Sequence, residues 1–327
     1  MNPASPSTGA FEPRAHLPVP NELQGRVIMV TGAGSGIGRA VALALAKAGA
    51  EVILLGRTVR KLEAVHAEIA QISKDSGGPE ATIVPLDLER ALAADYEAVA
   101  AAIAKRYGRL DGLLHNAALL GTLTPIEQYE VPLFMRVMHV NLTAAFVLTQ
   151  HLLPLLRASK DAAVLFTSSG VGKRGRAYWG AYSISKFAVE GFTQVLAHEL
   201  EGTTSVRVNI IDPGKVRTSM RRQAYPSEVA ESLPTAESLT APYVALLGPA
   251  SLGVTGQRFD AQGAIAPTTL RRSSSLISPS FRRASEIPLI SSSARMLRVV
   301  ASQYTSGNTT PGSSANARRS RSVARPS

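Results

Sequence analysis

The stretch "VTGAGSGIGRA", residues 30–40, decides the fold. It joins a continuous apolar run, "RVIMVT" at 26–31, to a segment of helical character, "GRAVALALAKAGA" at 38–50. The junction carries four glycines: Gly32, Gly34, Gly36 and Gly38. Glycine permits a tight turn and lets a phosphate approach the backbone, and the helix that follows presents free N–H groups to that phosphate. The junction therefore predicts a nucleotide-binding unit, with a purely structural turn as the alternative.

The same alternation of strand and helix continues along the chain. Apolar runs at 51–56, 81–86, 110–117, 162–169 and 205–214 predict strands, and segments at 58–72, 92–108, 133–158 and 178–201 predict helices. Strands that alternate with helices indicate βαβ units and a parallel sheet. Continuous apolar strands are typical of a sheet covered on both faces. The expected fold class is therefore α/β, with a doubly wound, Rossmann-like parallel sheet.

Composition divides the chain into three parts. Residues 1–24 are rich in Pro, Ala and Ser, which predicts a flexible arm, and residues 25–266 form the single Rossmann-like domain. Residues 267–327 are rich in Ser and Arg, and we expect a disordered tail there. This tail contains ten arginines, no lysine and one acid, so it carries +9 of the net charge of +11. The body of the protein is close to neutral.

Several classes of protein are excluded by what the sequence lacks. There is no cysteine, so neither a disulfide framework nor a thiolate metal site can form, and the six histidines are scattered without ligand spacing. We therefore expect no metal. No uninterrupted apolar stretch reaches about 18 residues and no signal peptide is evident, so we expect no membrane span. The lack of cysteine fits a reducing cytosol and a cytoplasmic location.

A second informative stretch is "SSGVGKRGRAYWGAYSISK" at 168–186. Tyr182 and Lys186 are four residues apart, so on a helix they lie on the same face. An ammonium beside the phenol would favour the phenolate and lower the tyrosine pKa. Ser169 ends the strand predicted at 162–169, at the sheet edge where α/β proteins bind ligands. The set predicts a proton donor or acceptor, with an ordinary amphipathic helix and a capping serine as the alternatives.

These motifs together resemble the classical short-chain dehydrogenase/reductase family. The resemblance extends over "LDL" at 86–88, "HNAALLG" at 115–121, "VNL" at 140–142, "DPGKVRT" at 212–218 and "TGQRFDAQG" at 255–263. The segments "VILLGR" and "GRAYWGAY" are most similar to those of the bacterial YciK-like oxidoreductases. The resemblance implies NAD(P)-dependent oxidation or reduction of an alcohol/carbonyl pair, and it does not indicate which molecule is the substrate.

The resemblance also implies catalytic roles. Tyr182 would be the general acid/base, and Lys186 would lower its pKa and hold the nicotinamide ribose. Ser169 would hydrogen-bond the substrate oxygen, and Asn141 would anchor a water in the proton relay. Hydride transfer to a carbonyl builds negative charge on oxygen, which needs a proton and a hydrogen-bond donor close by.

A nucleotide site is implied by the same resemblance. Its residues would be Thr31, Gly32, Gly34, Ser35, Gly36, Ile37, Gly38, Arg57, Asp87, Leu88, Asn116, Ala117, Pro213, Gly214, Val216 and Thr218. Asp87 would contact the adenine amine with Leu88 packed beside it, and Thr218 would reach the carboxamide. The chain departs from the family at Ala118, where a glycine is usual and a methyl group could crowd the ribose.

The end of the second predicted strand favours NADP over NAD as the cofactor. NAD-specific relatives usually carry an aspartate near Gly56, whereas this chain continues with Arg57. A guanidinium can bind a phosphate through two parallel hydrogen bonds, and the 2′-phosphate of NADP would supply that anion. Ser35 stands where NADP-dependent relatives often have a lysine or arginine, so NAD remains the alternative.

The expected partners are a small alcohol or carbonyl substrate and further copies of the chain. The resemblance implies that the helices at 134–158 and 178–201 pair into a homodimer or homotetramer. Two other functions stay open: a non-catalytic dinucleotide-binding sensor, and a polyanion-binding protein whose tail binds nucleic acid or an anionic membrane surface. The complete Asn141, Ser169, Tyr182 and Lys186 set speaks against a sensor, and a solvated tail is the favoured interpretation.

Overall fold

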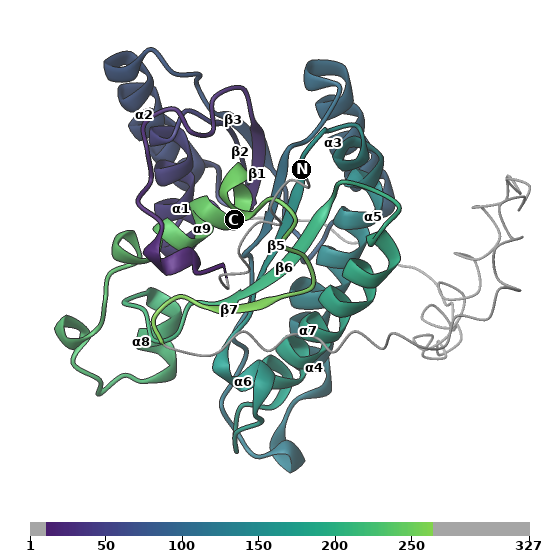
Figure 1. The fold of residues 1–327 in the computed structure, drawn as a ribbon. Helices are drawn as coiled ribbons and strands as arrows, with labels where there is room; N and C mark the ends of the chain where they lie inside the picture. Colours follow the sequence, from purple (N-terminus) through teal and green to yellow (C-terminus); the bar gives the residue numbers. More distant parts are fainter. Residues whose placement is uncertain (1–10, 264–327) are drawn as a thin grey trace, which may run out of the picture. The chain divides into compact units, whose positions relative to one another are not determined.

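The computed structural model describes residues 11–263, which form one seven-stranded sheet with helices on both faces (Figure 1). The strands are β1 (Val27–Thr31), β2 (Glu51–Gly56), β3 (Thr82–Pro85), β4 (Gly112–His115), β5 (Ala163–Thr167), β6 (Arg207–Asp212) and β7 (Arg258–Asp260). Their order is β3-β2-β1-β4-β5-β6-β7, and every neighbouring pair is parallel. The doubly wound Rossmann-like sheet is confirmed.

The helices form two layers (Figure 1). They are α1 (Gly36–Lys47), α2 (Val59–Ser76), α3 (Ala93–Tyr107), α4 (Val131–Met138), α5 (Ala144–Arg157), α6 (Gly170–Lys173), α7 (Gly180–Leu200), α8 (Ser219–Ala224) and α9 (Ala241–Leu247). Short 3-10 turns lie at Pro13–Ala15, Ile126–Gln128, Ala230–Ser232, Glu237–Leu239 and Pro249–Ser251. One core cluster joins α1, α2 and α9 to the sheet, and another joins α3, α5 and α7 to it.

The strands supply both clusters because successive side chains point to opposite faces of the sheet. In β1, Ile28 and Val30 pack with the α1, α2 and α9 layer, while Val27 and Met29 pack with the α3, α5 and α7 layer. This explains why the strands read as continuous apolar runs.

The helix predicted over 133–158 contains a turn that its sequence pattern does not reveal. A π-helical turn, His139–Thr143, joins α4 to α5, and π turns inside helices often occur at functional sites. By length and composition alone, the combined helix Val131–Arg157 could also cross a membrane. Leu148, Leu152 and Leu156 are fully buried against the sheet, however, so the protein core accounts for much of its apolar character.

The arm predicted over 1–24 is wrong for residues 11–24. Phe11 packs edge-on against Phe259 with ring centroids 5.9 Å apart, Pro13 is buried, and Leu23 is fully buried. The backbone N–H of Leu23 also donates to the carbonyl of Ala48 at 2.8 Å. A few apolar residues among prolines suffice to hold this segment on the domain, which composition alone could not show. Residues 1–10 and the predicted tail at 267–327 lie outside the described residues.

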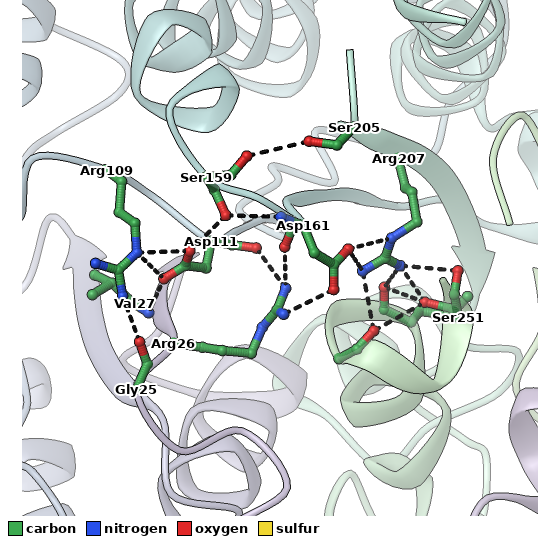
Figure 2. Close-up of polar contacts among 12 residues, drawn as sticks. Gly25, Arg26, Val27, Arg109, Asp111, Ser159, Asp161, Ser205, Arg207 and Ser251 are labelled. Carbon is green, nitrogen blue, oxygen red and sulfur yellow. Dashed lines mark hydrogen bonds and ion pairs between the residues drawn. The ribbon is translucent and has the colours of Figure 1, made fainter. Parts of the chain in front are cut away.

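The amino ends of the strands are joined by a partly buried network of charged residues (Figure 2). Asp161 accepts hydrogen bonds from Arg26 and Arg207, each at 2.9 Å, and Arg207 also donates to the carbonyls of Leu246 at 3.3 Å and Gly248 at 3.0 Å. Asp111 accepts from the backbone N–H of Val27 at 2.8 Å. The network ties the starts of β1, β4, β5 and β6 to the segment after α9, away from the opposite edge where a ligand is expected.

Candidate active site

The glycine-rich junction forms a turn in which side chains would not fit. A Cβ at Gly38 would lie 2.3 Å from the carbonyl oxygen of Gly32, and one at Gly32 would lie 3.0 Å from the Cα of Ala117. Gly32 has a φ of 67°, in the left-handed region that glycine favours. Helix α1 begins at Gly36, and the side chain of the preceding Ser35 does not cap it. The first N–H groups of α1 can therefore donate hydrogen bonds to a bound anion.

Thr31 joins this turn to the next strand. Its Oγ1 accepts the backbone N–H groups of Asn116 at 2.9 Å and Ala117 at 3.1 Å, and it donates to the carbonyl of Leu114 at 3.2 Å. These bonds hold the ends of β1 and β4 together. Thr31 therefore shapes the nucleotide site from beneath.

A cavity of about 500 Å³ runs along the carboxyl ends of the strands. It is lined by the predicted cofactor residues Gly32, Gly34, Ser35, Gly36, Ile37, Arg57, Asp87, Leu88, Asn116, Ala117, Pro213, Gly214, Val216 and Thr218. Thr31 and Gly38 do not line it and act on the shape of the turn instead. The structure thus brings together residues from five separate strand ends, as the topology of an open α/β sheet requires.

Ala118 also lines the cavity. It does not adopt a left-handed backbone, which among the described non-glycine residues occurs at Asn21 and Tyr178. An alanine is therefore accommodated without backbone strain at this position, where the resemblance to the family leads one to expect glycine.

The predicted catalytic side chains reach the same cavity from two elements. Ser169 is the second residue after β5 and the N-cap of α6, and Tyr182 and Lys186 lie one turn apart on α7. All three line the cavity, although Tyr182 is only 8% exposed and Lys186 only 4% exposed. The spacing in the sequence places Tyr182 and Lys186 together because a helix brings residues four apart onto one face. Ser169 joins them from the end of β5.

The expectation of a lowered Tyr182 pKa is wrong for this structure. Burial raises the pKa of Tyr182 to about 12, the charge of Asp212 adds to the rise, and the hydroxyl of Ser169 acts in the opposite direction. The ammonium of Lys186 donates to the carbonyl of Thr167 at 2.7 Å, so its hydrogen bond goes to β5 rather than to the phenol. Burial also lowers the pKa of Lys186 to about 8. The phenol is consequently protonated at neutral pH and suited to donate a proton.

Asn141 lies beneath the cavity, in the π-helical turn. Its Oδ1 accepts the N–H of Leu119 at 2.7 Å, while its Nδ2 donates to the carbonyl of Leu119 and to the hydroxyl of Ser185, each at 2.9 Å. The amide therefore fastens the segment after β4 to α7. Its role in anchoring a water of the proton relay stays a prediction.

The substrate end of the cavity is lined by residues that were not among the site residues predicted from the sequence. Met220, Arg221 and Gln223 line it beside Trp179. The ring of Trp179 lies 5.8 Å from that of Tyr182 and 5.9 Å from that of Tyr225. For Met220, Arg221 and Gln223 the place after "DPGKVRT" was the only available signal, because nothing in the spacing of this segment indicates which side chains turn inward.

No metal site is found in the described part of the chain, where no group of three or more His, Asp or Glu residues is arranged to hold an ion. The site geometry is thus that of a glycine-lined cavity with a buried tyrosine, lysine and serine at one end.

Comparison with known proteins agrees with this geometry. Residues 26–228 match the short chain dehydrogenase family. The chain is 44% identical over 252 residues to the uncharacterized oxidoreductase YciK of Escherichia coli K12, covering 77% of this chain and 96% of YciK. A short chain dehydrogenase from Salmonella enterica serovar Typhi CT18 is 46% identical, with a TM-score of 0.72, and covers 76% of this chain and 100% of its own. A protein from Shigella flexneri 2a, solved in complex with NADP, is 44% identical, with a TM-score of 0.71 and coverage of 75% and 100%.

The family match spans more than half of the chain, and the alignment with YciK spans nearly all of that relative. The chain therefore belongs to the short chain dehydrogenase family and is an oxidoreductase that acts on CH–OH and C=O groups.

Proposed function

We propose that this protein is an NADP-dependent oxidoreductase that interconverts an alcohol and a carbonyl compound, with Tyr182 as the general acid/base. One observation carries the proposal: Ser169, Tyr182 and Lys186 line the same cavity as the glycine turn at the start of α1. A nucleotide on the glycine turn and a substrate at Tyr182 would therefore share one enclosed space.

The residues of the site fit a dinucleotide. Hydrogen atoms alone fit at Gly32 and Gly38, which lets a diphosphate approach the backbone. Arg57 and Lys61 line the cavity near the end of β2, where a 2′-phosphate would lie in NADP. The NADP complex of the Shigella flexneri relative supports the same choice of cofactor.

The nicotinamide supplies the hydride when it is bound, and the protein supplies the proton. In the direction of reduction, the hydroxyl of Ser169 donates a hydrogen bond to the substrate oxygen as negative charge develops there. The phenol of Tyr182 is protonated because burial raises its pKa to about 12, so it can transfer its proton to that oxygen. Lys186 would hold the ribose with its ammonium. In the direction of oxidation, Tyr182 takes the proton back.

A panel of carbonyl substrates assayed with NADPH and NADH tests the proposal. The panel should pair anionic compounds with their neutral esters, because the segments that flank the substrate end carry several exposed cations, among them Lys173, Arg174, Lys215 and Arg222. We expect NADPH oxidation with at least one class, measured by the loss of absorbance at the nicotinamide band. NADPH binding without turnover of any member would instead favour the sensor alternative.

Assembly into a homodimer or homotetramer is part of the proposal. Helices α5 and α7 expose apolar side chains, including Phe146 at 47%, Phe187 at 44% and Val195 at 57%. Such a patch supports pairing of these helices between copies. Light scattering on the full chain measures the assembly. A cytoplasmic location stays a prediction, and polyanion binding by the tail concerns residues outside those described.

A further inference from the structure

Three buried charged residues beside the catalytic turn have no role in the proposed reaction so far. Asp212 ends β6, Arg258 lies on β7, and Glu190 lies on α7; we call them the charged brace. Arg258 donates to Asp212 Oδ2 at 2.9 Å and to Glu190 Oε1 at 3.1 Å. Their side chains are only 7–12% exposed. The brace holds two carboxylates and one guanidinium, so it carries a net negative charge.

The brace is attached to both turns that form the substrate end of the cavity. Glu190 accepts a hydrogen bond from the hydroxyl of Ser168, the neighbour of Ser169. Asp212 Oδ2 lies 3.6 Å from the place that a Cβ of Gly170 would take, so Asp212 borders the turn that carries Ser169. Asp212 Oδ1 accepts the N–H of Gly214 at 2.9 Å, which fixes the Pro213–Gly214 turn.

The brace also lies next to Lys186. Glu190 is four residues after Lys186, one turn along α7. A Cβ on Gly172 would lie 2.9 Å from the hydroxyl of Ser168 and 3.0 Å from the Cβ of Lys186, so the partner of Glu190 and the stem of Lys186 are near each other. Asp212 and Glu190 both raise the pKa of Lys186 and so oppose the effect of burial, and Asp212 also raises the pKa of Tyr182.

We propose that Asp212, Arg258 and Glu190 are positioning residues of the reaction, which hold the Ser169 and Gly214 turns in place and set a net negative charge beside the ammonium of Lys186. The inference rests on the proposed function in one respect, namely that Lys186 binds the nicotinamide ribose. The titratable and charged groups around Lys186 are Tyr182 and Glu190 on α7, Asp212 on β6, Arg258 on β7 and Tyr243 on α9. A buried ion pair of purely structural value is the alternative.

The test measures the dissociation constant of NADPH against pH by nucleotide fluorescence, which needs no substrate. In the parent, affinity should fall as Lys186 loses its proton, and Lys186→Ala should abolish that step. Glu190→Gln and Asp212→Asn each remove a negative charge, so each should move the step to lower pH, on the order of one pH unit. Glu199→Gln is the matched control, because Glu199 lies on the same helix and is exposed. It should leave the step in place.

A variant that should shift the pH of the step in the opposite direction sharpens the test. Arg258→Gln removes the positive charge of the brace and should move the step to higher pH, and Arg258→Lys should restore the parental position. If Arg258→Gln does not fold, the two carboxylate variants decide alone.

The contrary outcomes are distinct. Carboxylate variants that weaken NADPH binding equally at every pH, or that only lower stability, would show a structural ion pair and overturn the inference. A parent without any Lys186-dependent step would overturn both the inference and the ribose role of Lys186. A silent carbonyl panel with the step present would count against the proposed function alone.

Discussion

The two ends of the central sheet bury charged groups in opposite ways. At the amino ends, Arg207 is 3% exposed, and its guanidinium donates to Asp161 and to the carbonyls of Leu246, Gly248 and Ser251 (Figure 2). At the carboxyl ends, Lys186 is buried to a similar degree, and within residues 11–263 its ammonium has a hydrogen bond to the carbonyl of Thr167 alone.

Hydroxyl groups show the same contrast. Within the described residues, the buried hydroxyls of Tyr96, Thr167 and Tyr243 have no hydrogen-bond partner, and Thr167 ends β5 at the carboxyl side of the sheet. At the amino side, the Nε of Arg26 is likewise without a partner. Ser159 and Ser251, in contrast, donate to Asp111 at 2.6 Å and to the carbonyl of Leu246 at 3.0 Å. The hydroxyls of Ser159 and Ser251 at the amino ends are thus satisfied, whereas the hydrogen-bonding capacity of the Thr167 hydroxyl is unused. It remains open where a substrate and cofactor are expected, at a cost in stability.

The largest expected effect is on turnover. Tyr182→Phe keeps the ring and its packing but removes the proton that the site transfers, so kcat should fall by about 10²–10⁴-fold. The dissociation constant of NADPH should stay nearly unchanged. Steady-state rates with the best substrate of the panel, together with nucleotide fluorescence, measure the two effects. Reduction at the parental rate would show that Tyr182 is not the acid.

The next effect belongs to the other end of the sheet. Arg207→Met would leave the partly buried Asp161 with Arg26 as its remaining cation and would take the donor from the carbonyls of Leu246 and Gly248, so the free energy of unfolding should fall by about 3–5 kcal/mol. Urea denaturation measures the change. The matched control is Arg106→Met, which breaks the more exposed pair with Glu51 and should cost at most about 1 kcal/mol. NADPH affinity of the folded variant should not change, and a large loss of affinity would break the division between the two ends.

A smaller effect concerns a cation at the carboxyl end that makes no ion pair within residues 11–263. Arg57→Ala should weaken NADP binding by about 1.5–3 kcal/mol, because one charge-assisted contact with the 2′-phosphate is lost. NAD binding should be nearly unaffected. Arg60→Ala is the control, since Arg60 is exposed on α2 and does not line the cavity. Equal weakening of both nucleotides, or tighter parental binding of NAD, would refute the preference for NADP.

The smallest effect has the opposite sign from that of Arg207→Met. Burial lowers the pKa of Lys186 from 10.5 to about 8, so its charged form destabilises the folded state. Lys186→Met should therefore raise the free energy of unfolding at pH 7 by about 1–3 kcal/mol.

The sign can be checked against pH. Below about pH 8 Lys186 is charged in both states and the full penalty is present, and between about 8 and 10.5 the folded protein loses its proton first. The free energy of unfolding of the parent should therefore rise relative to that of Lys186→Met as pH rises through this window, so the difference between them should shrink. Urea midpoints at pH 7 and pH 10 measure it. A loss of stability in Lys186→Met like that of Arg207→Met would mean that the two ends do not differ.

Local patterns were enough to predict most of the fold and much of the site. The glycines at 32–38 lie within a single turn, and Tyr182 and Lys186 lie one helical turn apart. Both features could therefore be predicted from spacing in the sequence. The alternation of apolar runs likewise predicted a doubly wound parallel sheet, which the structure confirms. The arm was wrong at residues 11–24, because the contact of Phe11 with Phe259 joins residues from opposite ends of the domain.

The sequence by itself determined the fold class, the family resemblance and most of the residues that line the candidate site, because these depend on periodicity and on short spacings. Only the tertiary structure decided the electrostatics of the site. Burial, and not the nearby ammonium, controls the pKa of Tyr182, and Asp212, Arg258 and Glu190 meet across three separate elements. Burial and long-range charge depend on which segments pack together in space, and no local pattern of residues encodes that.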